Sequence, residues 1–174
     1  PEFFRPLLEQ ERLELRRKFN INSNTFTTGF VFRNQIRKSI GALLEGYSQF
    51  KKENLGVDSK LLLHTCFSEG WNIMKQAEYY GVPKEDILTT YICENCLEYE
   101  VKPFIGEKQN CKFCQSLKSQ RTTSPKLGVT EEQLCEIYNL MDVYCHPISS
   151  GGLEITASCE SKFCELPVLA TNYS

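Results

Sequence analysis

Helical and strand patterns alternate through the last third of the chain, residues 128–171. One strand is predicted at Asp142–His146 and another at Val168–Thr171. Between them lie a small-residue loop and a second helical pattern that starts near Glu154. Apolar residues at helical spacing precede the first strand: Leu134, Ile137, Leu140 and Met141. The order helix, strand, loop, helix, strand is typical of a parallel α/β sheet.

The earlier part of the chain repeats this alternation. Helical patterns cover Pro6–Phe19, Ile36–Phe50 and Ser68–Tyr80, and strand patterns cover Phe26–Phe32, Lys60–Cys66 and Ile87–Ile92. The strands KLLLHTC and ILTTYI lack polar–apolar alternation, which indicates burial on both faces. We therefore predict an α/β fold in which helices flank a Rossmann-like parallel sheet, over residues 1–174.

Charge and hydropathy exclude some classes of function. The net charge is −2 and the pI about 5.8, so no overall positive field favours nucleic acid or an anionic membrane. No apolar run approaches the roughly 20 residues of a membrane span, and no signal peptide is visible. Because the chain does not begin with Met, we interpret it as a fragment of a longer protein. We expect a cytoplasmic location.

Cysteine spacing predicts a metal site. The odd count of 9 cysteines in 174 residues favours a reducing compartment over a disulfide framework. Two Cys-x-x-Cys pairs supply the candidate ligands Cys93, Cys96, Cys111 and Cys114. Four thiolates on two such knuckles can surround Zn²⁺ tetrahedrally, with bonds of about 2.3 Å. We predict a structural zinc ribbon inserted over residues 91–116, whose segment 97–110 unfolds without metal. A redox pair or disulfides are the alternatives.

The ribbon also suggests a second class of function, a nucleic-acid or protein binding module without catalysis. Its segment 97–110 carries acids beside Lys102 and Lys108, so it offers no basic, aromatic platform. We therefore expect no nucleic-acid partner.

Several motifs in a fixed order resemble a known family. They are Met141-Asp142-Val143, His146-Pro147, Glu160 and Pro167-Val168-Leu169-Ala170-Thr171. Together they resemble the donor domain, the C-terminal half, of the retaining glycosyltransferases of family four (group 1), which have the two-domain GT-B fold. The resemblance covers nearly the whole chain outside the cysteine insertion. It implies half of a GT-B fold, without the acceptor domain that would precede it and the C-terminal helix that would follow.

A basic pair follows the first predicted strand. Arg33 and Lys38 have the spacing of the family's arginine and lysine, although Phe32 replaces a glycine. The resemblance implies that both cations stabilise the charge of a leaving diphosphate, with no catalytic metal. The alternative is a solvated basic face at a helix N-terminus, where the helix dipole disfavours cations.

The loop between the last two strands is the predicted phosphate contact. Backbone N–H groups of Gly151, Gly152 and Leu153 at a helix N-terminus suit an anion, although Gly-Gly can also be only a tight turn. The resemblance assigns the ribose hydroxyls to Glu160. The family's first glutamate would fall on Gly152, and Glu154 is the only acid near it. Either the loop length or the recognition of the donor sugar therefore differs.

The resemblance also implies a reaction. A hexose would move from a nucleoside-diphosphate sugar to an acceptor hydroxyl, with retention at the anomeric carbon. Thr90 and Tyr91, late in the third strand, are candidates for contact with the nucleotide base. We expect this fragment to bind nucleotide sugar without turnover. A dinucleotide reductase is the third class, but Phe32–Gln35 lacks its Gly-x-Gly-x-x-Gly motif.

Overall fold

The computed structural model describes residues 3–148 and 155–172. Its elements, in chain order, are α1 (Glu9–Lys18), β1 (Phe26–Val31), the 3₁₀ turn η1 (Ile36–Lys38), α2 (Ile40–Glu53), β2 (Ser59–His64), α3 (Ile73–Tyr80), the 3₁₀ turn η2 (Lys84–Asp86), β3 (Ile87–Cys93), β4 (Tyr99–Pro103), β5 (Lys108–Gln109), β6 (Gln120–Thr122), α4 (Glu131–Asn139), β7 (Val143–His146), α5 (Ile155–Phe163) and β8 (Val168–Ala170). No helix within these residues has the length and the apolar character needed to cross a membrane.

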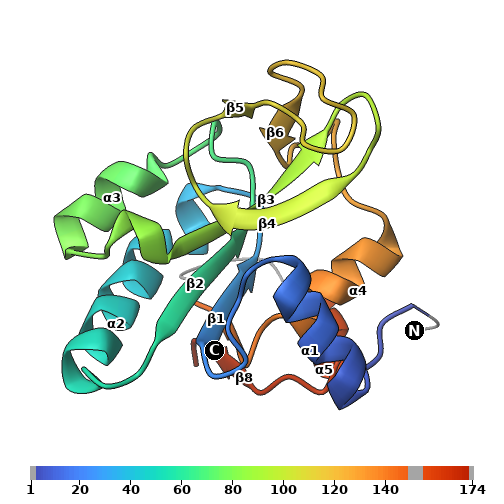
Figure 1. Cartoon of the computed structure of the whole chain (residues 1–174). Helices are drawn as coiled ribbons and strands as arrows, with labels where there is room; N and C mark the ends of the chain where they lie inside the picture. The colour runs from blue at the N-terminus through green and yellow to red at the C-terminus, as the bar shows by residue number, and fades with distance from the viewer. Residues whose placement is uncertain (1–2, 149–154, 173–174) are drawn as a thin grey trace.

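A parallel sheet in the order β3-β2-β1-β7-β8 forms the centre of the molecule. Helices α2 and α3 lie on one side of it, and α1, α4 and α5 lie on the other (Figure 1). The strand order therefore reverses between β1 and β7. In open α/β sheets, ligands bind beyond the carboxyl ends of the strands at such a switch point. The predicted α/β fold with a mostly parallel sheet is confirmed.

The cysteine-containing segment adds antiparallel strands to β3. β4 pairs along one edge of β3, and β6 pairs with Tyr91–Cys93, beyond the point where β2 ends. Phe104, after β4, stacks on Phe67, after β2, with ring centroids 4.3 Å apart. β4, β5 and β6 thus extend the same sheet and lie toward its carboxyl end (Figure 1).

Helix α1 begins at Glu9, later than the predicted Pro6, and two further helices also begin later than their patterns predict. Helix α3 begins at Ile73. The side chain of Asn72, its N-cap, accepts a 2.9 Å hydrogen bond from the Lys75 N–H. The predicted start at Ser68 is wrong because Gly70 has a φ of +62°, which no helix tolerates. The helix predicted from Ile36 is instead a 3₁₀ turn that ends at Ser39 (φ 49°), and α2 follows from Ile40.

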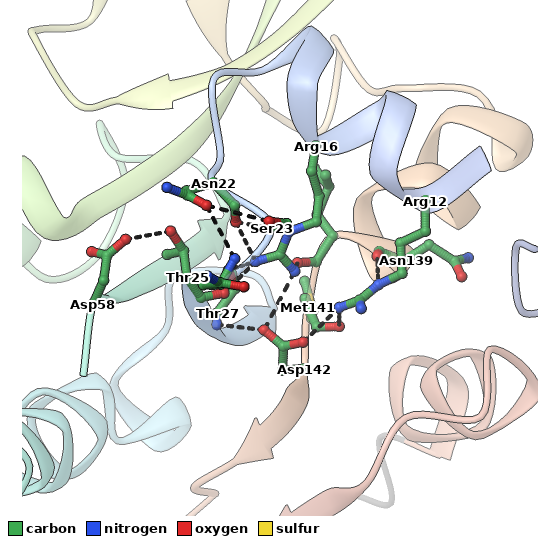
Figure 2. A network of polar contacts seen from close by, with 12 residues as sticks. Arg12, Arg16, Asn22, Ser23, Thr25, Thr27, Asp58, Asn139, Met141 and Asp142 are labelled. Atoms are coloured by element: carbon green, nitrogen blue, oxygen red, sulfur yellow. Dashed lines mark hydrogen bonds and ion pairs between the residues drawn. The ribbon is translucent and has the colours of Figure 1, made fainter. Parts of the chain in front are cut away.

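A buried arginine binds α1 to the amino edge of the sheet, opposite the carboxyl edge. Arg16 is 1% exposed and donates to the backbone oxygens of Asn22, Thr25 and Leu140. Its Nη1 also lies 3.4 Å from a carboxylate oxygen of Asp142, which accepts a 2.7 Å bond from the Thr27 N–H. Figure 2 shows Arg12 and Arg16 reaching from α1 to this carboxylate. One carboxylate thus joins α1, the start of β1 and the residue before β7.

Candidate functional site

A cleft of about 560 Å³ lies at the carboxyl edge of the sheet, at the switch point between β1 and β7. It is lined from four directions: the end of β1 and its exit loop, the end of β2 and its exit loop, the segment between β6 and α4, and helix α5. The residues that line it are Val31, Phe32, Arg33, His64, Cys66, Glu69, Thr123, Ser124, Pro125, Gly128, Thr156, Ala157 and Glu160. We call it the Arg33–Glu160 cleft. The two side chains come from opposite halves of the chain, and the fold brings them together.

Arg33 is held at this cleft by contacts between two loops. Its Nε lies 3.5 Å from a carboxylate oxygen of Glu69, and its side chain is 61% exposed. The neighbouring Asn34 is buried, donates to the Trp71 carbonyl at 2.8 Å and accepts from the Trp71 N–H at 3.2 Å. Gly70 passes so close that a Cβ on it would lie 1.9 Å from the Asn34 carbonyl oxygen. The loop after β1 and the loop after β2 are therefore packed directly against each other.

Replacing Gly70 by alanine should separate these loops. The φ of +62° and the backbone contact with Asn34 both exclude a Cβ. We expect the free energy of unfolding to fall by roughly 1–3 kcal/mol, measured by urea denaturation. Gly56→Ala is the matched control, because a Cβ there meets no described atom within 4 Å. Equal stability of the two variants would contradict the description of the loop contact.

Lys38 lies near the carboxyl end of β7. Its side chain is fully buried. Burial, and secondarily the charge of Lys38, lowers the pKa of His146, the last residue of β7. Burial, and secondarily the charge of Arg37, lowers the pKa of Lys38 to about 8. Among the described residues, Lys38 does not line the Arg33–Glu160 cleft. The predicted pair therefore reaches the same edge of the sheet, with one member in the cleft and the other buried beside β7.

Glu160 lies on α5 and faces the cleft together with Thr156 and Ala157. The buried Tyr138 of α4 donates a 2.8 Å hydrogen bond to its Oε2. The predicted phosphate contacts Gly151, Gly152 and Leu153, and the acid Glu154, lie outside the described residues.

The two candidate base contacts are buried in β3. The Thr90 hydroxyl lies 3.0 Å from Nδ1 of His64, and the Tyr91 hydroxyl donates to the Gly106 carbonyl at 2.7 Å. Within the described chain neither side chain lines the cleft, whereas His64 does. Burial lowers the pKa of His64 to about 4, so its ring is neutral near pH 7. Its position at the end of a parallel strand was the only sequence signal for this residue.

The predicted metal ligands form a cluster. The Sγ atoms of Cys93, Cys96, Cys111 and Cys114 all lie within 4.8 Å of one another, and the closer pairs are 3.6 and 3.7 Å apart. Tetrahedral coordination with bonds of about 2.3 Å requires sulfur atoms about 3.8 Å apart. All 9 cysteines are free thiols. The cysteine cluster could therefore hold one metal ion, with every coordination position filled by protein.

The segment after the cysteine cluster continues to the Arg33–Glu160 cleft. The Ser119 carbonyl accepts a 2.8 Å bond from the Glu94 N–H, next to Cys93. β6 follows, pairs with the last residues of β3, and leads to Thr123, Ser124 and Pro125, which line the cleft. The strand that follows the predicted insertion 91–116 thus pairs with β3, and the segment after it forms one side of the cleft.

Solved structures with a similar fold are known, although no family model and no curated protein matches the sequence. A glycosyltransferase from Rickettsia africae ESF-5 matches with a TM-score of 0.62 and 14% identity, over 99% of this chain and 36% of its own. This chain has the fold of a glycosyltransferase domain. The C-terminal domain of a glycosyl transferase group 1 family protein from Francisella tularensis matches with a TM-score of 0.60 and 13% identity. That match covers 97% of this chain and 68% of the other.

The comparison also shows how much of such a protein this chain represents. It spans only about a third of the length of the Rickettsia glycosyltransferase, with 36% of that chain covered. The fold, a mostly parallel sheet flanked by helices, is like that of GT-B domains, and this chain also carries the cysteine cluster.

Proposed function

We propose that this chain is the donor-binding domain of a retaining glycosyltransferase that transfers a hexose from a nucleoside-diphosphate sugar to an acceptor hydroxyl. The observation that carries the proposal is the shared cleft of Arg33 and Glu160 at the sheet's switch point. An acceptor-binding domain would complete the active site, as in other proteins of two-domain architecture. By itself this chain is proposed to bind the donor and not to turn it over.

The chemistry follows from the charges. As the glycosidic bond breaks, negative charge grows on the leaving diphosphate, and a fixed guanidinium beside it stabilises that charge. Arg33 can exchange its exposed contact with Glu69 for a bidentate contact with phosphate. The Glu160 carboxylate accepts hydrogen bonds from the ribose hydroxyls, while N–H groups of residues 151–153, which precede α5 in the sequence, are proposed to meet the phosphates.

We further propose that the ion of the cysteine cluster is zinc and that its role is structural. Four thiolates are the ligand set of closed zinc sites, and such a site leaves no position open for substrate. The ion would hold the insertion against β3, and with it the residues Thr123–Pro125 that line the cleft.

A thermal-shift panel of UDP, GDP, ADP and their sugars tests the donor-binding function. At a hundredfold excess over Kd, a bound nucleotide should raise the Tm by roughly 5–10 °C. Arg33→Ala and Glu160→Ala should each remove most of this rise. Arg17→Ala, an exposed change on α1, should leave it intact. A full rise in both cleft variants would refute the assignment, and tight salt-dependent binding of an oligonucleotide instead would favour a nucleic-acid module.

The lowered pKa of Lys38 predicts a pH dependence of this binding. Its cation favours an anionic ligand, and the free protein loses that cation as pH rises through about 8. Binding then requires uptake of a proton, so the association constant should fall by up to about tenfold per pH unit above pH 8. Burial lowers the pKa of His146, so its ring is already neutral there and does not produce this slope. Calorimetry from pH 7 to 9.5 should show the slope in the wild type and a flat profile in Lys38→Met.

A further inference from the structure

A buried tyrosine contacts the carboxylate that lines the cleft. Tyr138 on α4 is fully buried, and its hydroxyl donates to Oε2 of Glu160 on α5 at 2.8 Å. Within residues 3–148 and 155–172, no other group hydrogen-bonds this carboxylate. The contact joins two helices that both cover the same face of the sheet (Figure 1).

The tyrosine ring itself has little freedom to move. Phe4 packs against it edge-on, with centroids 6.0 Å apart and ring planes at 75°. Tyr144 of β7 packs edge-on from another side, at 5.9 Å and 61°. Phe4, distant in sequence, and Tyr144 therefore restrict where the Tyr138 hydroxyl lies.

The electrostatics make this hydroxyl a permanent donor. Burial, and then the charge of Glu160, raises the pKa of Tyr138 far above its ordinary value. The phenol keeps its proton at every physiological pH, so it always presents a hydrogen to Oε2. A carboxylate that accepts one bond from a fixed donor loses most of its rotational freedom, while its Oε1 keeps its capacity to accept further bonds.

We propose that Tyr138 is a positioning residue for recognition of the ribose. It holds the Glu160 carboxylate so that Oε1 can accept the vicinal hydroxyls of a ribonucleotide bound in the Arg33–Glu160 cleft. This inference rests on the proposed donor-binding function. It adds a residue outside the cleft that sharpens the selection of a ribonucleotide with both hydroxyls free.

Binding of UDP, GDP and ADP and of their 2′,3′-dideoxy forms, measured by calorimetry, tests the inference. In the wild type, loss of the two hydroxyls should raise Kd about tenfold or more. Tyr138→Phe removes only the phenolic oxygen. It should raise Kd for the ribonucleotide about five- to tenfold and change Kd for the dideoxy form less than about twofold. Tyr144→Phe, an equally buried tyrosine whose hydroxyl bonds the Val31 carbonyl, is the matched control and should preserve the discrimination.

A second variant separates positioning from general stability. In Glu160→Gln the discrimination should already be lost, and adding Tyr138→Phe should change Kd no further, because both substitutions remove the same interaction. Glu160→Gln alone tests this role if Tyr138→Phe does not fold: unchanged discrimination in it overturns the inference. Equal weakening of ribo and dideoxy forms by Tyr138→Phe also overturns it.

The outcomes also distinguish this inference from the proposed function. If Tyr138→Phe binds every probe like the wild type while Arg33→Ala binds weakly, the positioning role is wrong and donor binding stands. If the wild type binds none of the diphosphates, both are wrong.

Discussion

Replacement of Arg16 by methionine is expected to lower the free energy of unfolding by about 3–5 kcal/mol. The guanidinium is 1% exposed and shared between the Asp142 carboxylate and three backbone oxygens (Figure 2). Methionine has a similar length but no donor, so these acceptors would be left buried and partly unpaired. The loss should loosen α1 from the amino ends of β1 and β7. Urea denaturation with circular dichroism measures the change.

The control for this prediction is the next residue on the same helix. Arg17 is exposed, and Arg17→Met should change the free energy of unfolding by less than about 0.5 kcal/mol. If Arg16→Met is also within about 1 kcal/mol of the wild type, the buried network does not hold α1, and the account of the amino edge is wrong.

Replacement of Cys111 by serine is expected to remove the metal and the order of the insertion together. Serine is a poor zinc ligand, and binding to a four-thiolate site is coupled to folding of the surrounding chain. We expect amide exchange in β4, β5 and β6 to accelerate by at least about 100-fold, while β1 and β2 stay protected. Hydrogen exchange with mass spectrometry gives the protection, and elemental analysis gives the metal content.

Two comparisons complete this experiment. Cys159→Ser, on α5 and outside the cysteine cluster, should keep both the metal and the protection. Because Thr123–Pro125 line the Arg33–Glu160 cleft, loss of the metal should also weaken nucleotide binding about tenfold or less, without abolishing it. If the purified wild type contains no metal and its insertion is still protected from amide exchange, the zinc assignment is contradicted.

The arrangement of the sheet could be predicted from sequence because its signals are local. The three leucines of KLLLHTC are buried in β2 and ILTTYI is buried in β3, and strands 26–32 and 142–146 appear within one residue of their expected ends. The knuckles were equally predictable, since two Cys-x-x-Cys turns need only fold toward each other. The start of α3 was not, because Gly70 is fixed by a contact with Asn34, which is distant in sequence.

The site was only partly visible in the sequence for the same reason. Arg33 and Glu160 were singled out from motifs, and the structure places both on one cleft, although their roles stay predictions. His64 and Tyr138 are ordinary members of a strand and a helix in the sequence. Their importance comes from partners on other elements, Thr90 and Glu160, and pairing between elements leaves no local pattern.

The central claim is that Arg33 and Glu160 bind two parts of one nucleoside diphosphate. Calorimetry with inorganic pyrophosphate and with the best nucleoside diphosphate of the panel tests it most directly. Arg33→Ala should weaken the binding of both ligands about tenfold or more. Glu160→Ala should weaken the binding of the nucleotide alone and leave pyrophosphate binding unchanged. Wild-type affinity for the nucleotide in both variants would contradict the claim.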